Sequence, residues 1–166
     1  MMDRALSLLL VLAAGCEPAE SEDGPEPGSS CGPSSAVVAR VVDGDTVELD
    51  DGTRVRYLMI DTPESTSGKD DCFGAEATAL NRMLVEGQEI TLRYDVECTD
   101  RYDRLLAYIE VDGREINSLL VERGAACVLH IPPNGEDRVD EFTALEDDAR
   151  ASMVGVWGAC EDVTCD

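Results

Sequence analysis

Apolar and polar residues alternate in several short stretches of the chain, which is the pattern of strands with one buried face. Turn-forming residues separate these stretches, and Asp50-Asp51-Gly52 in particular is typical of a hairpin turn. Residues Arg54 to Ile60 form the clearest run, which ends before Pro63 because proline has no N–H for a ladder. We predict strands over 36–42, 46–49, 53–60, 89–94 and 105–111.

Helical periodicity replaces the alternation in three places. Residues 75–86 carry one apolar face and are followed by Gly87. Asn117 can cap a short second helix, which ends at Gly124. A third helix carries an apolar stripe that we interpret as core packing: Val139, Phe142, Leu145, Ala149 and Met153. Five strands and three helices in this order predict an α+β fold, a small closed β-barrel of the oligonucleotide-binding (OB-fold) type.

The first 35 residues follow neither pattern. Residues 1–15 contain an early arginine, a short apolar run and then small residues, which indicates an export signal and not a membrane span. The stretch before Cys16 resembles a bacterial lipobox, in which this cysteine becomes the acylated first residue, although Ala13 stands where leucine is usual. Cleavage by a plain signal peptidase near the same small residues is the alternative. Residues 16–35 are rich in Pro, Gly, Ser and acidic residues, so we expect a disordered tether.

One domain is expected over 36–160, with a short tail over 161–166. The expected location is outside the cytoplasm, as a lipoprotein anchored to a membrane in the periplasm or at the cell surface, or else as a secreted protein.

The chain has seven cysteines, and assigning Cys16 to lipidation leaves six. An even number of cysteines in an exported domain predicts a set of disulfides and an oxidising compartment. The cysteines are not spaced as paired Cys-x-x-Cys motifs, which argues against structural zinc. The six are Cys31, Cys72, Cys98, Cys127, Cys160 and Cys165.

Two acidic segments lie at the ends of neighbouring predicted strands. Asp43-Gly44-Asp45-Thr46 alone reads as a turn, and Asp61-Thr62-Pro63-Glu64 alone reads as a strand end followed by a turn. If the two strands pair, Asp45 and Asp61 meet at one end of the sheet, beside an arginine and a glutamate. Such a combination suits a hard cation and a phosphate.

Three motifs that occur in order along the chain indicate which family these segments resemble. V-x-D-G-D-T, R-x-x-x-x-D-T-P-E and D-x-Y-x-R-x-L-A-Y are matched from Val41, Arg56 and Asp100. Together they resemble the staphylococcal nuclease-like (thermonuclease) family, over about residues 36–158. The resemblance implies an OB-fold barrel and a nuclease that hydrolyses nucleic acid with a calcium ion (Ca²⁺).

The resemblance also assigns roles to individual residues. Asp45, Asp61 and the Thr62 carbonyl would hold the calcium ion, with Asp43 acting through water. Glu64 would orient or deprotonate the attacking water. Arg56 and Arg104 would clamp the phosphate, where a guanidinium offers two parallel hydrogen bonds.

Substrate contacts and disulfide pairs follow from the same resemblance. Arg101 and Tyr102 match positions that contact a nucleotide phosphate. His130 stands near the place of an aromatic residue that stacks on a base, next to an apparent deletion of one residue, and it is either a stacking group or a bystander. The resembled fold suggests pairing Cys72 with Cys98, Cys127 with Cys160, and Cys31 with Cys165.

The charge of the chain opposes a nucleic-acid partner. There are 13 basic and 36 acidic residues, and the net charge is −23, whereas nucleic-acid binding draws on basic surfaces. Two functions therefore stay open. The first is a calcium-dependent monomeric nuclease outside the cytoplasm, which cleaves DNA and/or RNA with little sequence specificity. The second is a catalytically weak, acidic, calcium-binding or ligand-binding lipoprotein. Retention of Glu64 together with Arg56 and Arg104 favours the first.

Overall fold

The computed structural model describes residues 31–65, 68 and 71–163. The expected export signal over 1–15, the lipidation site Cys16, most of the expected tether and Cys165 lie outside the described residues. Among the helices of the described part, none has the length and apolar character needed to cross a bilayer.

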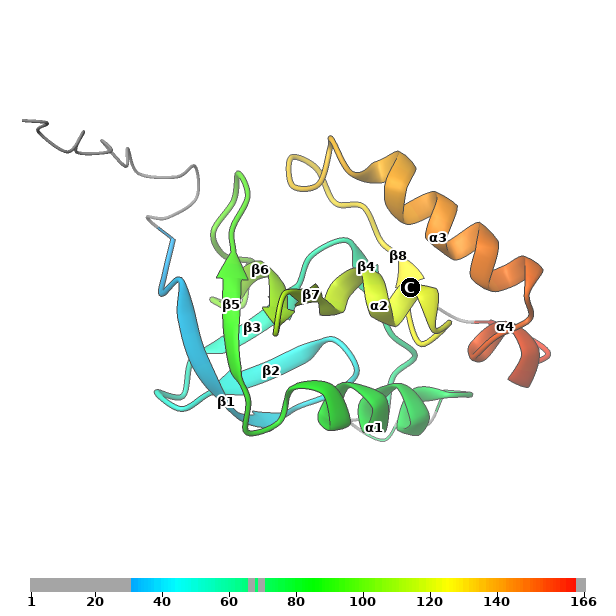
Figure 1. The fold of residues 1–166 in the computed structure, drawn as a ribbon, viewed down its shortest axis with the longest axis horizontal. Helices are drawn as coiled ribbons and strands as arrows, with labels where there is room; N and C mark the ends of the chain where they lie inside the picture. Colours follow the sequence, from blue (N-terminus) through cyan, green and yellow to red (C-terminus); the bar gives the residue numbers. More distant parts are fainter. Residues whose placement is uncertain (1–30, 66–67, 69–70, 164–166) are drawn as a thin grey trace, which may run out of the picture.

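Five strands close into a barrel (Figure 1). β1 (Ser35–Val41) pairs antiparallel with β2 (Thr46–Leu49) and with β5 (Glu89–Arg93). β2 pairs antiparallel with β3 (Arg54–Tyr57), and β5 pairs antiparallel with β6 (Leu105–Val111). A parallel pairing of β3 with β6 then closes the ring. The predicted OB-fold-type barrel in an α+β domain is confirmed.

Shorter elements complete the described part of the chain. Two small ladders are made by β7 (Arg114–Glu115), which pairs with β6, and by β4 (Ile60–Asp61), which pairs with β8 (Cys127–Val128). The helices are α1 (Gly74–Val85), α2 (Ile116–Glu122), α3 (Val139–Ala151) and the single turn α4 (Val156–Ala159). The first three lie where the sequence predicts them, while α4 was not expected.

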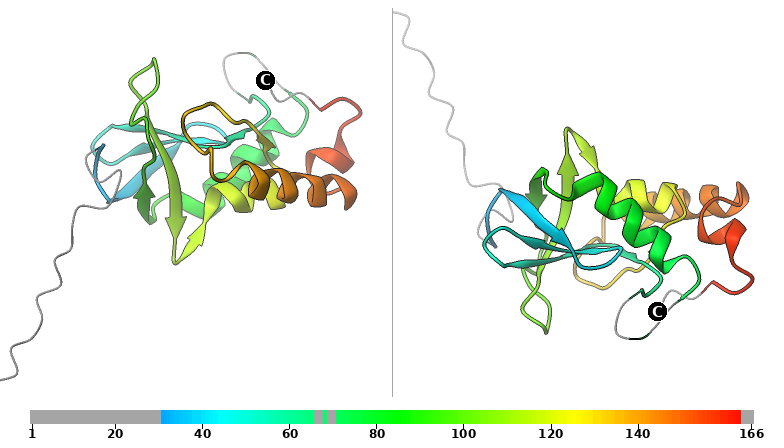
Figure 2. Two further views of the ribbon diagram at one scale, coloured as in Figure 1. Left: turned by 90° about the horizontal axis from the view of Figure 1, so that it is seen from above. Right: turned by 90° about the horizontal axis from the view of Figure 1, so that it is seen from below.

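Apolar side chains from all five barrel strands fill the interior. Each strand contributes a fully buried residue: Val38, Val47, Val55, Ile90 and Ile109. α1 packs against β1, and α2 lies between β6 and α3. Both views in Figure 2 place α3 and α4 on the side of the molecule away from β1. The core therefore extends from the barrel into the helices, and it holds the barrel strands rigidly at the end where the acidic segments lie.

The predicted strand over 53–60 is divided by a sharp bend. Met59 has a positive φ of 68°, and β3 and β4 run on either side of the bend. Asn117 fixes it: its side-chain amide donates to the Leu58 carbonyl at 2.9 Å, and its oxygen accepts from the Ile109 amide at 2.9 Å. The predicted role of Asn117 as a helix cap is therefore wrong, because its side chain is used to join the bend to β6.

The end of α2 agrees with the prediction. Gly124 has a φ of 61°, and its amide donates to the Val121 carbonyl while the Ala125 amide donates to the Leu120 carbonyl. This pair of bonds is the Schellman arrangement that glycine favours. The stripe predicted for α3 needs one correction, because Met153 lies beyond the helix and is exposed.

The segment before β1 belongs to the folded part, although the tether was expected to continue to residue 35. Ser35 already lies in β1, the Leu92 amide donates to the Ser34 carbonyl, and the Tyr94 hydroxyl donates to the Pro33 carbonyl. These contacts form because Ser35 lies opposite Thr91, so the chain ahead of β1 runs past the end of β5.

The same geometry overturns the expected disulfide pairs. The structure contains Cys31–Cys98 and Cys72–Cys160, so none of the three pairs suggested by the resembled fold is formed. Cys127 is also disulfide-bonded. Cys31 meets Cys98 because the start of β1 adjoins the loop after β5, and Cys72, before α1, meets Cys160 directly after α4.

Candidate functional site

Arg56 joins the two acidic segments. Its Nε lies 3.1 Å from Asp45 Oδ1, and its Nη2 lies 2.6 Å from Asp61 Oδ1. Its Nη1 donates to the Tyr57 and Ile60 carbonyls on either side of the bend. The bend therefore wraps around one guanidinium, and the predicted meeting of Asp45 with Asp61 beside an arginine is present.

Asp45 is the most buried carboxylate of the site, with a side-chain exposure of 7%. Its Oδ2 accepts from the Thr62 amide at 2.9 Å and from the Thr62 hydroxyl at 3.1 Å. Gly44 allows this close approach, because a Cβ there would lie 2.5 Å from the Thr62 hydroxyl oxygen. The glycine of the first motif is therefore needed for the packing of the two segments against each other.

Asp43 lies beside Asp45 and accepts a hydrogen bond from the Asp45 amide at 3.1 Å. Burial, together with the negative charge of Asp45, raises the pKa of Asp43 to about 7. Its backbone is held from α1, since Asn81 donates to the Asp43 carbonyl and accepts from the Tyr57 hydroxyl.

Glu64 is held through its backbone by Asp71. The Glu64 amide donates to Asp71 Oδ2 at 3.1 Å, and the Asp71 amide donates back to the Glu64 carbonyl at 2.9 Å. Gly74 packs directly under this carbonyl, where a Cβ would approach to 2.5 Å. The start of α1 therefore sets the position of the Glu64 backbone.

Arg104 is oriented by Asp100 in the turn that precedes β6. Asp100 Oδ2 accepts from Arg104 Nε at 2.7 Å, and Asp100 Oδ1 accepts from the Tyr102 and Arg104 amides. Burial by itself would raise the pKa of Asp100, but these hydrogen bonds and the charge of Arg104 outweigh burial and lower the pKa. The same turn exposes Tyr102 at 62% of its surface.

Tyr102 stands between two arginines. Arg101 Nη2 donates to the Tyr102 hydroxyl at 2.7 Å, and the Arg101 and Arg104 guanidinium carbons lie 4.7 and 5.5 Å from the ring centre. An exposed ring flanked by cations offers a flat apolar face beside two positive charges.

Three hollows adjoin one another around these side chains. The central hollow has a volume of about 430 Å³ and is lined by Asp43, Asp45, Arg56, Asp61, Thr62, Glu64, Asp71, Arg101, Tyr102 and Arg104. A larger groove of about 570 Å³ shares five of these residues and continues along Leu58, Met59, Glu97, Leu129, Ile131 and Asn134. A hairpin hollow of about 460 Å³ lies between Gly52, Thr53, Arg54 and the turn over Tyr102, Asp103 and Arg104.

Apart from His130, the predicted catalytic, metal and substrate residues all line the central hollow. His130 does not line any of the three hollows, although its neighbours Leu129 and Ile131 line the groove. Its Nε2 is buried and has no hydrogen-bond partner among the described residues. The structure therefore does not bring His130 to the other site residues.

Comparison with known proteins identifies the family. The sequence model of the family described as "Staphylococcal nuclease homologue" matches residues 54–159. The chain belongs to this family. A thermonuclease of Staphylococcus intermedius is 32% identical over 128 residues, which cover 74% of this chain and 76% of that protein.

Two further relatives are longer. The endonuclease YncB of Bacillus subtilis (strain 168) is 33% identical over 132 residues, which cover 75% of this chain and 62% of YncB. The prophage-derived endonuclease YokF of the same strain is 34% identical over 125 residues, 71% of this chain and 42% of YokF. The chain therefore spans about three fifths of the length of YncB and about two fifths of YokF.

The donor set of this family member suits a hard cation. Asp45 and Asp61 contact Arg56, and Asp43, Glu64 and Asp71 line the same hollow, so its five carboxyl groups outnumber the three guanidinium groups of Arg56, Arg101 and Arg104. In residues 31–65, 68 and 71–163, no three His, Cys, Asp or Glu side chains form a ready-made metal cluster. A cation on Asp45 and Asp61 would therefore need carbonyl oxygen and water to complete its coordination, which calcium tolerates.

Two residues of the site were not predicted from the sequence. Asp71 lies seven residues after Glu64 with no recognisable motif between them, and Asp100 was recognised only as the start of a motif. Each acts by holding a neighbour, Glu64 or Arg104, through hydrogen bonds that depend on loop geometry. The sequence contains only weak indications of their roles. Asp71 is an acidic residue just ahead of a predicted helix, and Asp100 lies just ahead of Arg101 and Tyr102.

Proposed function

We propose that this protein is a metal-dependent endonuclease that hydrolyses phosphodiester bonds of DNA and/or RNA with little sequence specificity. The observation that carries the proposal is the convergence of Glu64, Arg56 and Arg104 on one hollow that also contains Asp45 and Asp61. Membership of the staphylococcal nuclease homologue family, and similarity to an endonuclease and a thermonuclease, support the same reaction.

Glu64 acts on the attacking water. Its carboxylate accepts a hydrogen bond from a water molecule in the central hollow and takes the proton as the water oxygen attacks phosphorus. The bond from phosphorus to the leaving sugar oxygen then breaks, and this oxygen takes a proton from solvent water to leave as an alcohol. Asp71 keeps the Glu64 backbone fixed during this step through the two hydrogen bonds between them.

Arg56 and Arg104 stabilise the charge that develops on the phosphate oxygens. Their guanidinium groups are held by Asp45, Asp61 and Asp100 before substrate arrives, so little reorganisation is needed when the charge appears. Acidic partners also limit the positive field around the site, which agrees with a net charge of −23 and predicts slow association with nucleic acid.

Calcium is the proposed metal, held by Asp45, Asp61 and the Thr62 carbonyl, with Asp43 acting through water. When bound, Ca²⁺ would supply positive charge next to the phosphate and compensate the carboxyl groups that the three arginines leave in excess. Hard oxygen donors and the absence of His and Cys from this set support calcium over zinc.

The two flanking hollows favour cleavage within a strand. The groove extends from the central hollow on the Leu129 side, and the hairpin hollow extends on the Arg54 side, with Tyr102 and Arg104 shared between them. A nucleic-acid strand that occupies both would place an internal phosphodiester over the central hollow. Arg101 and Tyr102 would contact this strand through a phosphate and a base.

Digestion of a circular single-stranded DNA and of a structureless RNA tests the proposal. We expect fragmentation with calcium and none with a chelator, and no fragmentation by Glu64→Gln at any calcium concentration. Circles have no ends, so loss of the circle reports internal cleavage. Intact DNA circles together with intact RNA, in the presence of calcium-loaded protein, would contradict the proposal.

The alternative is an acidic calcium-binding lipoprotein with weak catalysis. The excess of acidic residues in the chain favours it. Calorimetry combined with the cleavage assay separates the two functions. Both predict calcium binding that Glu64→Gln leaves unchanged, but only the alternative predicts a wild type that binds calcium without efficient cleavage.

We also propose that the protein is exported and anchored by lipid on Cys16, and that it acts as a monomer. Two disulfides, Cys31–Cys98 and Cys72–Cys160, support an oxidising compartment. Metabolic labelling with a palmitate analogue should mark the wild type and not Cys16→Ser, and gel filtration should give the mass of one chain. Label on Cys16→Ser would contradict the anchor.

A further inference from the structure

The loop between β5 and β6, residues 94–104, carries the exposed part of the site. Arg101 and Tyr102 lie at its tip, and Asp100 orients Arg104 at its end. This loop separates the central hollow from the groove and the hairpin hollow, since Tyr102 and Arg104 line all three. Its position therefore decides how a strand is bound.

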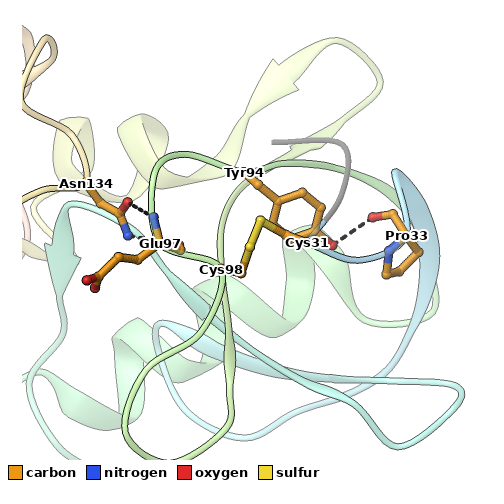
Figure 3. The surroundings of a disulfide bond; sticks show 6 residues. All are labelled: Cys31, Pro33, Tyr94, Glu97, Cys98 and Asn134. Atoms are coloured by element: carbon orange, nitrogen blue, oxygen red, sulfur yellow. Dashed lines mark hydrogen bonds between the residues drawn. A yellow bond between two sulfur atoms is a disulfide. The ribbon is translucent and has the colours of Figure 1, made fainter. Parts of the chain in front are cut away.

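A first clamp, made of hydrogen bonds from Asn134 and Gly135, holds the first half of the loop. Asn134, only 3% exposed, accepts from the Glu97 amide at 2.8 Å and donates to the Glu97 carbonyl at 3.2 Å (Figure 3). Beside it, the Gly135 amide donates to Asp95 Oδ2 at 2.6 Å. These bonds fix residues 95–97 to the segment before α3, ahead of the tip.

The Cys31–Cys98 disulfide is the second clamp. In Figure 3 it lies beside Tyr94, whose hydroxyl donates to the Pro33 carbonyl at 2.8 Å. Gly32 packs closely against Tyr94, because a Cβ at Gly32 would lie 2.6 Å from the hydroxyl oxygen. Cys31 is thus joined through Pro33 and Ser34 to the start of β1, and the disulfide ties the loop covalently to the barrel.

Beyond Cys98 the hydrogen bonds are local to the hairpin. The Leu106 amide donates to the Cys98 carbonyl, the Asp103 amide donates to the Asp100 carbonyl, and Asp100 binds Arg104. Leu106 lies in the barrel strand β6, so its bond holds the base of the tip, whereas the hydrogen bonds of Arg101 and Tyr102 among the described residues stay within the tip. Arg104, in contrast, adjoins β6 and reaches Thr46 at 3.5 Å, so the barrel also holds it.

We propose that the Cys31–Cys98 disulfide positions Arg101 and Tyr102 for substrate binding, so that the oxidised protein binds nucleic acid well and the reduced protein binds it poorly. This inference rests on the proposed function. A dithiol reductant supplies two electrons and two protons, the S–S bond breaks to give two thiols, and the reductant becomes a disulfide. Both cysteines are partly exposed, so such a reductant can reach the bond.

Such a dependence suits an enzyme made in the cytoplasm and used outside it. In a reducing cytoplasm the loop would lack its covalent tie, and the nuclease would bind the nucleic acids of its own cell weakly. Oxidation after export would then restore the affinity. Because Arg56, Glu64 and Arg104 are held by other contacts, the switch acts on KM and not on kcat.

The test compares two variants that each lack one of the two described disulfides. Cys31→Ser/Cys98→Ser should raise KM for a single-stranded oligonucleotide about tenfold and leave kcat within about twofold. Cys72→Ser/Cys160→Ser removes the other described disulfide, which lies away from the loop, and should leave KM within about twofold. Circular dichroism confirms that both variants are folded, and wild type treated with dithiothreitol and mapped by alkylation should repeat the rise in KM.

Two further measurements separate this inference from the proposed function. The affinity of each protein for a phosphorothioate oligonucleotide reports binding without cleavage, and amide exchange of residues 98–103 reports the loop directly. Equal KM and equal exchange in wild type and Cys31→Ser/Cys98→Ser would overturn the inference. A wild type that neither cleaves nor binds oligonucleotide overturns the proposed function, and the amide exchange then decides whether the disulfide positions the loop.

Discussion

The site has a half built on the barrel and a half built on loops, and the two are held differently. Asp45, Arg56 and Asp61 have side-chain exposures of 7%, 13% and 19%, and ion pairs and backbone carbonyls fix them. Tyr102 is 62% exposed and depends on its own turn and on a disulfide nearby. The groups proposed to meet the developing charge are therefore rigid, and the groups proposed to meet the rest of the strand are adaptable.

This difference predicts a kinetic division between the halves. Barrel residues act on the reacting phosphate, so their loss should lower kcat. Loop residues act on binding of the strand, so their loss should raise KM. Glu64 lies between the two classes, because a loop carries it but the start of α1 fixes it.

The largest effect is expected for Arg56→Lys, which keeps the charge and loses the fork that binds Asp45 and Asp61 together. We expect kcat to fall by about a hundredfold to a thousandfold with little change in KM. Arg40→Lys is the matched control. Arg40 also makes two hydrogen bonds to one carboxylate, that of Glu48, but it lines none of the three hollows. Near-normal turnover of Arg56→Lys would show that the two hydrogen bonds offered by the Arg56 guanidinium are not needed for the reaction.

Asp45→Asn should weaken calcium binding by about tenfold or more, measured by calorimetry. It should also lower the free energy of unfolding by about 1–3 kcal/mol, because the new amide cannot accept from both Arg56 and Thr62. Asp50→Asn, at the exposed hairpin turn, is the control for both measurements. Unchanged calcium affinity in folded Asp45→Asn would exclude Asp45 as a ligand.

A smaller effect is expected for Asp71→Ala, which removes the acceptor for the Glu64 amide. We expect kcat to fall about tenfold, because a displaced Glu64 no longer holds the water in line. Asp71→Asn keeps an acceptor oxygen, so its kcat should lie close to that of the wild type. If Asp71 acted only through its charge, the kcat of Asp71→Asn would be as low as that of Asp71→Ala. Glu76→Ala, on the exposed face of α1, serves as the control.

The smallest effect is expected for Tyr102→Ala, which removes the exposed ring beside Arg101 and Arg104. KM should rise about fivefold through lost stacking, while kcat stays within about twofold. Tyr102→Phe keeps the ring and should bind almost as the wild type. A fall in kcat of Tyr102→Ala with unchanged KM would mean that the loop takes part in the chemical step. The proposed division between barrel residues and loop residues would then be wrong.

Much of the fold could be predicted because its signals are local. Alternation along β3 and β5, and the glycine after α2, depend on near neighbours in the sequence. The bend at Met59 could not be predicted, because it depends on Asn117, which is far along the chain and donates to the Leu58 carbonyl. The link between Asp71 and Glu64 was missed for a different reason, because no motif marks their short spacing.

The chemical groups of the site could be read from residue types along the chain. Three ordered motifs placed two aspartates, two arginines and a glutamate on the strands and turns of one barrel, and pairing of adjacent strands brings such residues together. These conclusions rest on residue type and short spacing, and both can be read along the chain.

How those groups are held depends on the packing of segments that are distant in the sequence. This packing joined Cys31 to Cys98 and Cys72 to Cys160, it turned Gly44 toward Thr62, and it left His130 outside the hollows. Each outcome depends on the distance between segments far apart in sequence, and several arrangements of loops on one barrel satisfy the same local pattern. The packing of β1 beside β5 selected the arrangement that brings the chain ahead of β1 to the loop that carries Tyr102.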